Sequence, residues 1–220
     1  MRQCLSFIFG DEKMSDGEAL KIIQERCGCS ADGYFGRNTA KGIVGFYELS
    51  PERGAHLLGQ LHVESLGLRR TKEYMNYSLE RLMKTWPKRF PTEESAAPYV
   101  NNPKALAAKV YMRKELGNDT REKAQMFTGR SFIQITGYAN YKEFASDMSL
   151  PRVLTDPSLL ENEYAMEGAL WYFKKRKLWD LADQGVSDDV IKSITLKING
   201  GTHGLEDRNK WTKKIYQWLI

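Results

Sequence analysis

Residues 53–65 read Arg53-Gly-Ala-His-Leu-Leu-Gly-Gln-Leu-His-Val-Glu-Ser65, a run with the residue spacing of an amphipathic helix. Leu57, Leu61 and Glu64 are separated by three, four or seven positions, so they share one face of that helix. The Ser-Pro pair at positions 50 and 51 supplies a cap residue and a preset first helical residue. We therefore predict a helix over residues 51–65, with Glu64 at the end of its apolar stripe.

Helical spacing continues outward from this stretch in both directions. The capping box Ser15-Asp-Gly-Glu18 opens a helix toward Cys27, a second helix ends near Tyr47, and Asn102-Pro103 opens one that runs to about Leu116. The spacing predicts further helices near residues 161–183, 187–198 and 205–219. Segment 69–102 is rich in aromatic, basic and proline residues and is predicted to form long surface loops. The predicted fold class is mainly α, with short strands confined to residues near 130–136.

The composition is that of a globular protein with a basic surface. Of 220 residues, 41% are hydrophobic and 28% are charged, which argues against disorder and allows one sizeable core plus a small appended module. Lys and Arg number 33 against 28 Asp and Glu, and the sequence pI is near 9.0. This balance suits an anionic partner such as nucleic acid, a membrane face or a bacterial wall, or it is simply a solvated basic surface.

The cysteines and the N-terminus bear on the compartment. The odd set Cys4, Cys27 and Cys29 lacks the further Cys or His ligands of a zinc site, so we expect free thiols from a reducing compartment and no metal. The first ten residues lack the apolar run of a signal peptide, and no stretch reaches the length of a membrane span. We therefore expect synthesis in the cytoplasm without a signal peptide or stable membrane insertion.

Two glutamates stand out as a candidate acid–base pair. Glu64 ends an apolar stripe, and a partly desolvated carboxyl keeps its proton to higher pH, as a general acid must. Glu73 lies nine residues later among Arg69, Arg70 and Lys72, whose charges are expected to lower its pKa, as suits a general base. The alternative is that Glu64 is an ordinary helix-end glutamate paired with Arg69 or Arg70.

A longer block makes the signal more specific. Phe127-Thr-Gly-Arg-Ser-Phe-Ile-Gln-Ile-Thr-Gly-Tyr-Ala-Asn-Tyr141 resembles the signature of glycoside hydrolase family 19, the chitinase-like family that includes many phage endolysins. The resemblance also covers Gln60 to Gly67, Glu73 to Ser78, and Ile198-Asn-Gly-Gly201 with Arg208, or about residues 48–220 in all. It implies a lysozyme-like or chitinase-like helical catalytic domain that uses no cofactor.

The resemblance also implies roles for individual residues. The family's acid falls on Glu64, its base on Glu73, and the residue that holds the attacking water on Thr136, where many relatives have Ser. Substrate-binding roles fall on Arg130, Gln134, Tyr138, Asn140, Asn199 and Arg208. The chain departs from the family at Val63, where His is common, and at Gly-Arg-Ser-Phe, where Gly-Arg-Gly-Pro is common.

Structural roles for the same residues stay open from the sequence. Thr136, Tyr138 and Tyr141 could belong to a β-type turn packed under the core. Asn199 could serve only as a helix cap, and Arg208 could pair with Asp207 or Glu206. The three histidines are more typical of helix faces or loops than of metal ligands, because no ligand cluster accompanies them. They are His56, His62 and His203.

The N-terminal segment has a resemblance of its own. Residues 15–47, with the turn Asp32-Gly-Tyr-Phe-Gly36, resemble the small helical peptidoglycan-binding module, which implies wall contacts from Asp32, Tyr34 and Phe35. The alternative is a helical extension that merely packs on the catalytic domain. The predicted organisation is an extension over residues 1–14, this module over 15–47 and a catalytic domain over 48–220.

Together these expectations predict that the protein is an endolysin. It is expected to be a monomeric muramidase (lysozyme) that hydrolyses the β-1,4 glycan strands of peptidoglycan with inversion and lyses the host cell. It is expected to stay in the host bacterial cytoplasm until a separate holin-type protein permeabilises the membrane. Alternatives are a chitinase, a lytic transglycosylase, or a non-catalytic wall-binding or nucleic-acid-binding module. No nucleic-acid motif accompanies the basic runs Arg69-Arg70 and Lys174-Lys-Arg-Lys177, so nucleic acid is not an expected partner.

Overall fold

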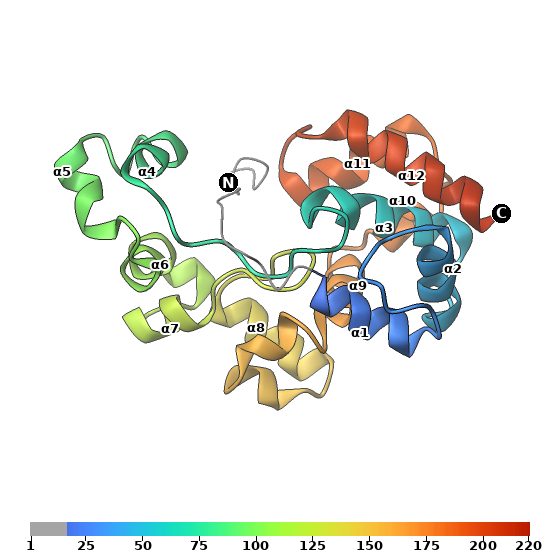
Figure 1. Ribbon diagram of the computed structural model, residues 1–220, viewed down its shortest axis with the longest axis horizontal. Helices are drawn as coiled ribbons and strands as arrows, with labels where there is room; N and C mark the ends of the chain where they lie inside the picture. The colour runs from blue at the N-terminus through green and yellow to red at the C-terminus, as the bar shows by residue number, and fades with distance from the viewer. Residues whose placement is uncertain (1–16) are drawn as a thin grey trace.

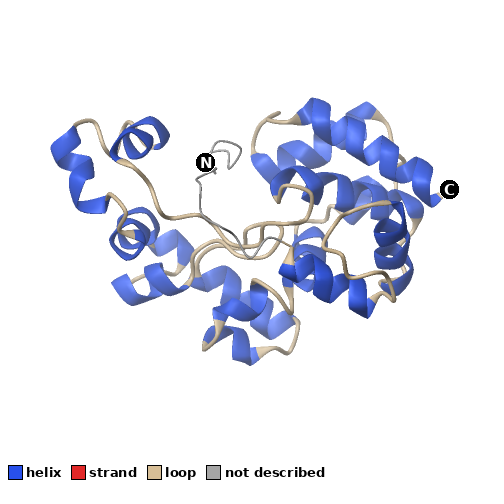
Figure 2. Ribbon diagram, viewed as in Figure 1, coloured by secondary structure: helices blue, strands red, loops and turns tan. Residues whose placement is uncertain are grey.

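A computed structural model of the chain describes residues 17–220, and within them the fold is mainly α, as predicted. Figure 2 shows helices and loops over this range, with no strand in it. The strands expected near residues 130–136 are reduced to isolated bridges of Arg130 with Lys72 and with Ile135. The predicted extension over residues 1–14 and the cap at Ser15 lie outside the described residues.

The helices follow one another along the chain in Figure 1. In the described range they are α1 (Glu18–Arg26), α2 (Arg37–Phe46), α3 (Pro51–Glu64), α4 (Leu79–Thr85), α5 (Glu93–Ala96), α6 (Pro103–Tyr111), α7 (Arg121–Met126), α8 (Tyr138–Asp147), α9 (Ala165–Lys175), α10 (Trp179–Ala182), α11 (Asp188–Asn199) and α12 (Leu205–Leu219). Short 3-10 turns at Ala97–Tyr99, Lys114–Leu116, Pro151–Leu154 and Pro157–Leu160 join some of them. Over residues 17–220, none of the helices combines the length and the hydropathy of a membrane-spanning segment.

Helix α3 forms the centre of the larger core. It begins as predicted, with the Ser50 hydroxyl accepting a 3.2 Å hydrogen bond from Arg53 N. Its leucines, Leu57 among them, are fully buried. Helix α12 packs closely against it at Gly59. The approach is so close that a Cβ at this position would overlap with Thr212 Oγ1. This close approach fixes the end of α3, and therefore Glu64, relative to α12.

The two N-terminal helices belong to the same core. Leu20 of α1 and Ile43 of α2 are fully buried in one hydrophobic cluster with the leucines of α3. The contact between α2 and α3 is tight, since a Cβ on Gly54 would lie 2.4 Å from Val44 Cγ2. The segment predicted as a wall-binding module is therefore packed onto the catalytic region, whatever else it binds.

A polar contact reinforces this packing. Glu167 on α9 accepts a hydrogen bond from Tyr47 Oη at 2.9 Å and pairs with Arg26 Nη1 at 3.1 Å. The Glu167 side chain is 18% exposed, so the contact is partly shielded from water. It ties both N-terminal helices to α9.

Residues 74–111 form what we call the small lobe, which Figure 1 shows as a group of helices apart from the larger core. The prediction of long loops over residues 69–102 is wrong in this segment, since α4 and α5 lie within it. Its aromatic residues pack against one another, with ring centroids 5.0 Å apart for Tyr77 and Trp86 and 5.2 Å apart for Phe90 and Tyr99. They form a second hydrophobic core with residues such as Leu82 and Leu106.

Two predicted helices end earlier than expected. Helix α6 stops at Tyr111, whose carbonyl accepts a 2.9 Å hydrogen bond from the Asn118 side chain. Helix α9 ends at Lys175, two residues before Lys177 adopts a left-handed φ of 51°. The helix predicted over residues 161–183 is therefore two helices, α9 and α10. The predictions for α11 and α12 are confirmed to within a residue or two.

Candidate active site

Glu64, the last residue of α3, is held by an arginine from α12. Arg208 Nη2 lies 2.6 Å from Glu64 Oε1, and the two side chains are 4% and 10% exposed. The same guanidinium donates to Gln60 Oε1 at 2.5 Å, and Gln60 Nε2 donates to Thr195 Oγ1 of α11 at 3.0 Å. The candidate acid is thus part of a buried polar network that joins three helices.

This pairing differs from the sequence-based expectations for both residues. Glu64 is desolvated at the end of its apolar stripe but also has a charged partner, and that partner is Arg208 instead of Arg69 or Arg70. Arg208 does not pair with its neighbours Asp207 and Glu206, because it points inward, with Nε donating to the His203 carbonyl at 3.1 Å. Spacing along one helix could not reveal a partner 144 residues away.

Glu73 lies on the extended segment between α3 and the small lobe. Its carboxylate accepts hydrogen bonds from Tyr111 Oη and, at 3.3 Å, from Gly129 N, while its own N donates to the Gly129 carbonyl at 2.9 Å. The residue is 7% exposed. Burial raises the pKa of Glu73, and the hydrogen bonds from Tyr111 and Gly129 offset only part of that increase.

The predicted lowering of the Glu73 pKa by its sequence neighbours is therefore wrong. Neighbours on an extended segment alternate in direction, so Lys72 reaches Glu161, with Nζ and Oε1 3.2 Å apart. Arg130 lowers the pKa of Glu73 as well, but less than burial raises it. The environment of Glu73 therefore favours retention of a proton on its carboxyl group.

Three side chains predicted from the resemblance surround Gly129. A Cβ on this glycine would lie 3.2 Å from Glu73 Oε2, 3.2 Å from Thr136 Oγ1 and 2.6 Å from Gln134 Oε1. Gln134 adopts a left-handed φ of 59°, and among the described residues its buried Oε1 has no hydrogen-bond partner. The predicted base, the predicted water-holding hydroxyl and an unused acceptor therefore meet at one point, where only glycine leaves room.

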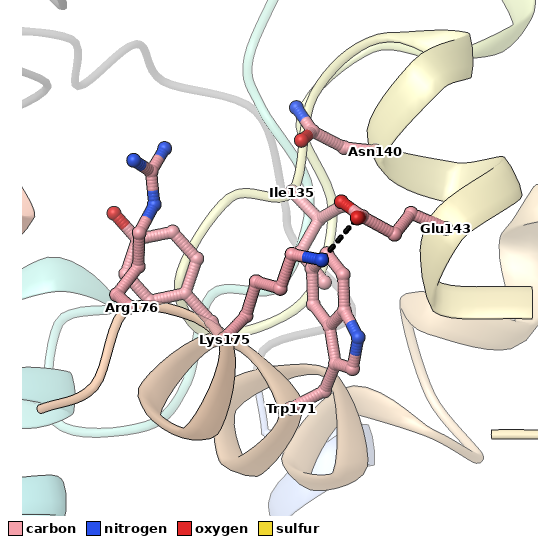
Figure 3. A pocket seen from close by; sticks show the side chains of 7 residues that line it. Ile135, Asn140, Glu143, Trp171, Lys175 and Arg176 are labelled. Carbon is pink, nitrogen blue, oxygen red and sulfur yellow. Dashed lines mark hydrogen bonds and ion pairs between the residues drawn. The ribbon is translucent and has the colours of Figure 1, made fainter. Parts of the chain in front are cut away.

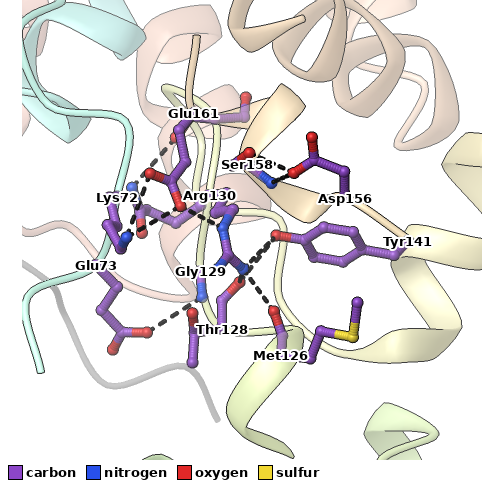
Figure 4. Close-up of polar contacts among 12 residues, drawn as sticks. Lys72, Glu73, Met126, Thr128, Gly129, Arg130, Tyr141, Asp156, Ser158 and Glu161 are labelled. Carbon is purple, nitrogen blue, oxygen red and sulfur yellow. Dashed lines mark hydrogen bonds and ion pairs between the residues drawn. The ribbon is translucent and has the colours of Figure 1, made fainter. Parts of the chain in front are cut away.

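Arg130 lies beside this point, and Figure 4 shows its polar contacts. Its Nε lies 2.6 Å from Glu161 Oε1, and its Nη1 donates to the Met126 carbonyl at 2.7 Å and to Tyr141 Oη at 3.3 Å. The Arg130 side chain is 11% exposed. Its charge is thus neutralised mainly within the protein, and its clearest role is to hold the block of residues 127–141 in shape.

The other predicted substrate-binding residues are more scattered. Asn140 donates to the Thr136 carbonyl at 2.6 Å and so lies beside the Gly129 cluster. Tyr138 packs on Phe127, with ring centroids 5.1 Å apart. Asn199 is the last residue of α11 and precedes the left-handed Gly200, whose φ is 70°.

A cleft of about 690 Å³ runs past Glu73 along the small lobe. Glu73, Thr128 and Arg130 line this cleft, whereas Glu64 does not. Among residues 17–220, the charged residues that line it are Arg69, Arg70, Lys72, Lys104, Arg130, Glu73 and Glu161. Five bases against two acids make the cleft a surface suited to an anionic ligand.

Sequence reasoning missed three residues of the site. Tyr111 resembles one more apolar residue of α6, Glu161 lies in a short irregular segment, and Gln60 lies within a helix of buried leucines. No local pattern marks any of them, because each acts through a partner far away in the sequence. In residues 17–220 no group of three or more His, Cys, Asp or Glu side chains could hold a metal ion.

Two glutamates in a helical fold, one of which lines a cleft, are compatible with a glycoside hydrolase, which uses two carboxyl groups. No protein-family model matches the chain. A Haemophilus influenzae protein, named glycosyl hydrolase family 19 domain-containing protein, is 33% identical over 159 residues, covering 71% of this chain and 74% of that protein. The chain belongs to glycosyl hydrolase family 19.

Proposed function

We propose that this family 19 enzyme is an endolysin, a muramidase that hydrolyses the β-1,4 glycan strands of bacterial peptidoglycan. The observation that carries the proposal is the charge of the cleft, with five basic residues against Glu73 and Glu161. Glu161 is already paired with Arg130 and Lys72. A cleft with this excess of positive charge favours a glycan that carries carboxylates, as peptidoglycan does, over neutral chitin.

The proposed reaction is a single displacement with Glu64 as acid and Glu73 as base. Burial makes Glu73 a stronger base than an exposed glutamate. The nearby Thr136 hydroxyl donates to the Gln134 carbonyl at 2.9 Å, so its oxygen can accept a hydrogen bond from a water molecule beside Glu73. Glu64 is held in one place by Arg208 and the packing of α3 on α12, which favours a preset direction of proton delivery.

The N-terminal turn supports a contribution to wall binding. Tyr34 is 69% exposed, and Arg69, which lines the cleft, has its Cζ 6.0 Å from the centroid of the Tyr34 ring. Asp32 holds the turn by accepting from Tyr34 N at 2.8 Å, and Phe35 packs beneath it against His62, with ring centroids 5.8 Å apart. We propose that Tyr34 stacks on a sugar of the strand that occupies the cleft.

The biological setting is proposed from the family resemblance. The enzyme acts as a monomer on peptidoglycan strands, binds no nucleic acid and does not insert stably into membranes. It stays in the cytoplasm of the host bacterium until a separate holin-type protein opens the membrane, and its activity then lyses the cell.

The test combines lysis with product analysis. Turbidity of outer-membrane-permeabilised Gram-negative cells should fall with the wild-type protein and not with Glu64→Gln. Mass spectrometry of digested peptidoglycan should show new reducing ends on muramic acid. Ends on glucosamine would mean a glucosaminidase, anhydromuramic ends a transglycosylase, and cleavage of chitin alone a chitinase.

A further inference from the structure

A second pocket, of about 250 Å³, lies beside the block that carries Thr136. Figure 3 shows it between α8 and the end of α9. The residues that line it are Ile135, Asn140, Glu143, Trp171, Tyr172, Lys175 and Arg176.

One residue of the pocket wall, Asn140, links it to the segment that carries Thr136. Asn140 forms part of its wall and donates a 2.6 Å hydrogen bond to the Thr136 carbonyl. The Thr136 hydroxyl is one of the groups that meet Glu73 at Gly129. A group bound in the pocket would therefore contact the same Asn140 that holds the backbone of Thr136.

The floor of the pocket is rigid and built around a fixed indole. Trp171 is 6% exposed, its Nε1 donates to Asp147 Oδ2 at 2.8 Å, and its ring meets Phe144 edge-on at 5.6 Å. Tyr172 is 4% exposed. Such a floor keeps its shape whether or not a ligand is present.

The mouth of the pocket is cationic. Lys175 forms an ion pair with Glu143 across it, both side chains being more than 40% exposed, and Arg176 Cζ lies 5.5 Å from the centroid of the Tyr172 ring. Lys175, Arg176 and Glu143 are the charged residues among those that line the pocket, and Asp147 lies close enough to act on the Lys175 charge. Because the Lys175–Glu143 pair is exposed to water, an incoming carboxylate can take the place of Glu143 at small cost in free energy.

We propose that this pocket binds a carboxylate of the peptide stem of peptidoglycan, held by Lys175 and Arg176. Its volume is below the roughly 300 to 1,000 Å³ of typical ligand pockets, so it suits one end group and not a run of sugars. Guanidinium and ammonium groups bind carboxylates through charge-assisted hydrogen bonds. This inference rests on the proposed function, since chitin carries no stem.

The test compares two substrates and two double variants. Soluble glycan strands that carry peptide stems are compared with the same strands stripped by an amidase, and kcat/KM is measured from new reducing ends. The test variant is Lys175→Gln with Arg176→Gln. The control is Lys174→Gln with Lys177→Gln, which removes the same charge from exposed residues of the same run that do not line the pocket.

The test variant should lose at least about tenfold in kcat/KM on stem-bearing strands and stay within about twofold on stripped strands. The control should match the wild type on both substrates. Equal losses on both substrates, no loss on stem-bearing strands, or an equal loss in the control would overturn the inference. Wild-type protein that cleaves neither substrate would overturn the proposed function, and the inference with it.

Discussion

Tyr111, the last residue of α6, donates a hydrogen bond to Glu73, so a side chain of the small lobe holds the proposed catalytic base. The phenol is buried, and burial beside the carboxylate raises the pKa of Tyr111 well above its ordinary value. Tyr111 therefore remains a donor at every pH at which the enzyme is expected to work. Its hydrogen bond stabilises the ionised form of Glu73.

Removing this donor should move the pH dependence of the reaction. In Tyr111→Phe the pKa of Glu73 rises further, so the acidic limb of kcat/KM should shift to higher pH. The direction follows because a base must be ionised to act, and the loss of a hydrogen bond to the ionised form makes ionisation harder. The measurement is kcat/KM against pH for both proteins.

The matched control for this variant is Tyr99→Phe, in the same lobe and packed on Phe90. It should leave the acidic limb in place. If the acidic limb of kcat/KM does not shift in Tyr111→Phe, or shifts to lower pH, the assignment of Glu73 as the base is contradicted.

The two glutamates should differ in their response to the leaving group. Glu64→Gln and Glu73→Gln should each lose about 10² to 10⁴-fold of activity on natural strands. On a dinitrophenyl glycoside of a chito-oligosaccharide, whose leaving group needs no proton, Glu64→Gln should recover most of its activity. Recovery by Glu73→Gln instead would exchange the two roles.

Arg208 should matter for folding as well as for catalysis. Arg208→Ala leaves Glu64 and Gln60 buried without their donor, which should lower the free energy of unfolding by about 3 kcal/mol. Urea denaturation measures this effect, with the exposed Lys210→Ala on the same helix as control. A loss no larger than that of the control would mean that the pair is much weaker than its burial implies.

The stereochemistry tests the role of Thr136. If Glu73 and this hydroxyl hold a water molecule, the first product from a β-linked strand is the α anomer, which proton NMR detects before mutarotation. Thr136→Val keeps the side-chain shape and should slow the reaction strongly, whereas Thr136→Ser should keep most of the rate. An initial β anomer would point to direct attack by a carboxylate.

Truncation tests the N-terminal helices. A protein that lacks residues 1–47 should be insoluble or fail to melt cooperatively, because Leu20 and Ile43 lie in the core with α3. Tyr34→Ala should fold normally and bind purified cell walls more weakly in a pull-down. A soluble, cooperatively folded truncated protein would favour an independent module.

How far the sequence predicts this molecule depends on how local each signal is. The helix that ends at Glu64 follows from one cap and one stripe, and α12 follows from its own spacing, so both were predictable. The small lobe was not, because the aromatic residues that fill its core, such as Trp86 and Phe90, lie in a segment of basic residues and prolines typical of loops.

The site residues also differ in how far local sequence predicts them. Glu73, Thr136 and Gln134 carry family motifs and do meet at Gly129. Their electrostatics could not be predicted, because the burial of Glu73 and the pairing of Glu64 with Arg208 depend on contacts between distant segments.

The shared core of α1, α2 and α3 also sets rules for building chimeras. In an enzyme whose targeting domain is joined by a flexible linker, that domain can be exchanged for another without changing the catalytic domain. Here such an exchange would remove side chains that pack in the shared core and would break the contacts of Glu167 with Arg26 and Tyr47. A designer who wishes to redirect this enzyme to another cell surface should therefore keep both helices and graft new specificity into the short turn around Tyr34.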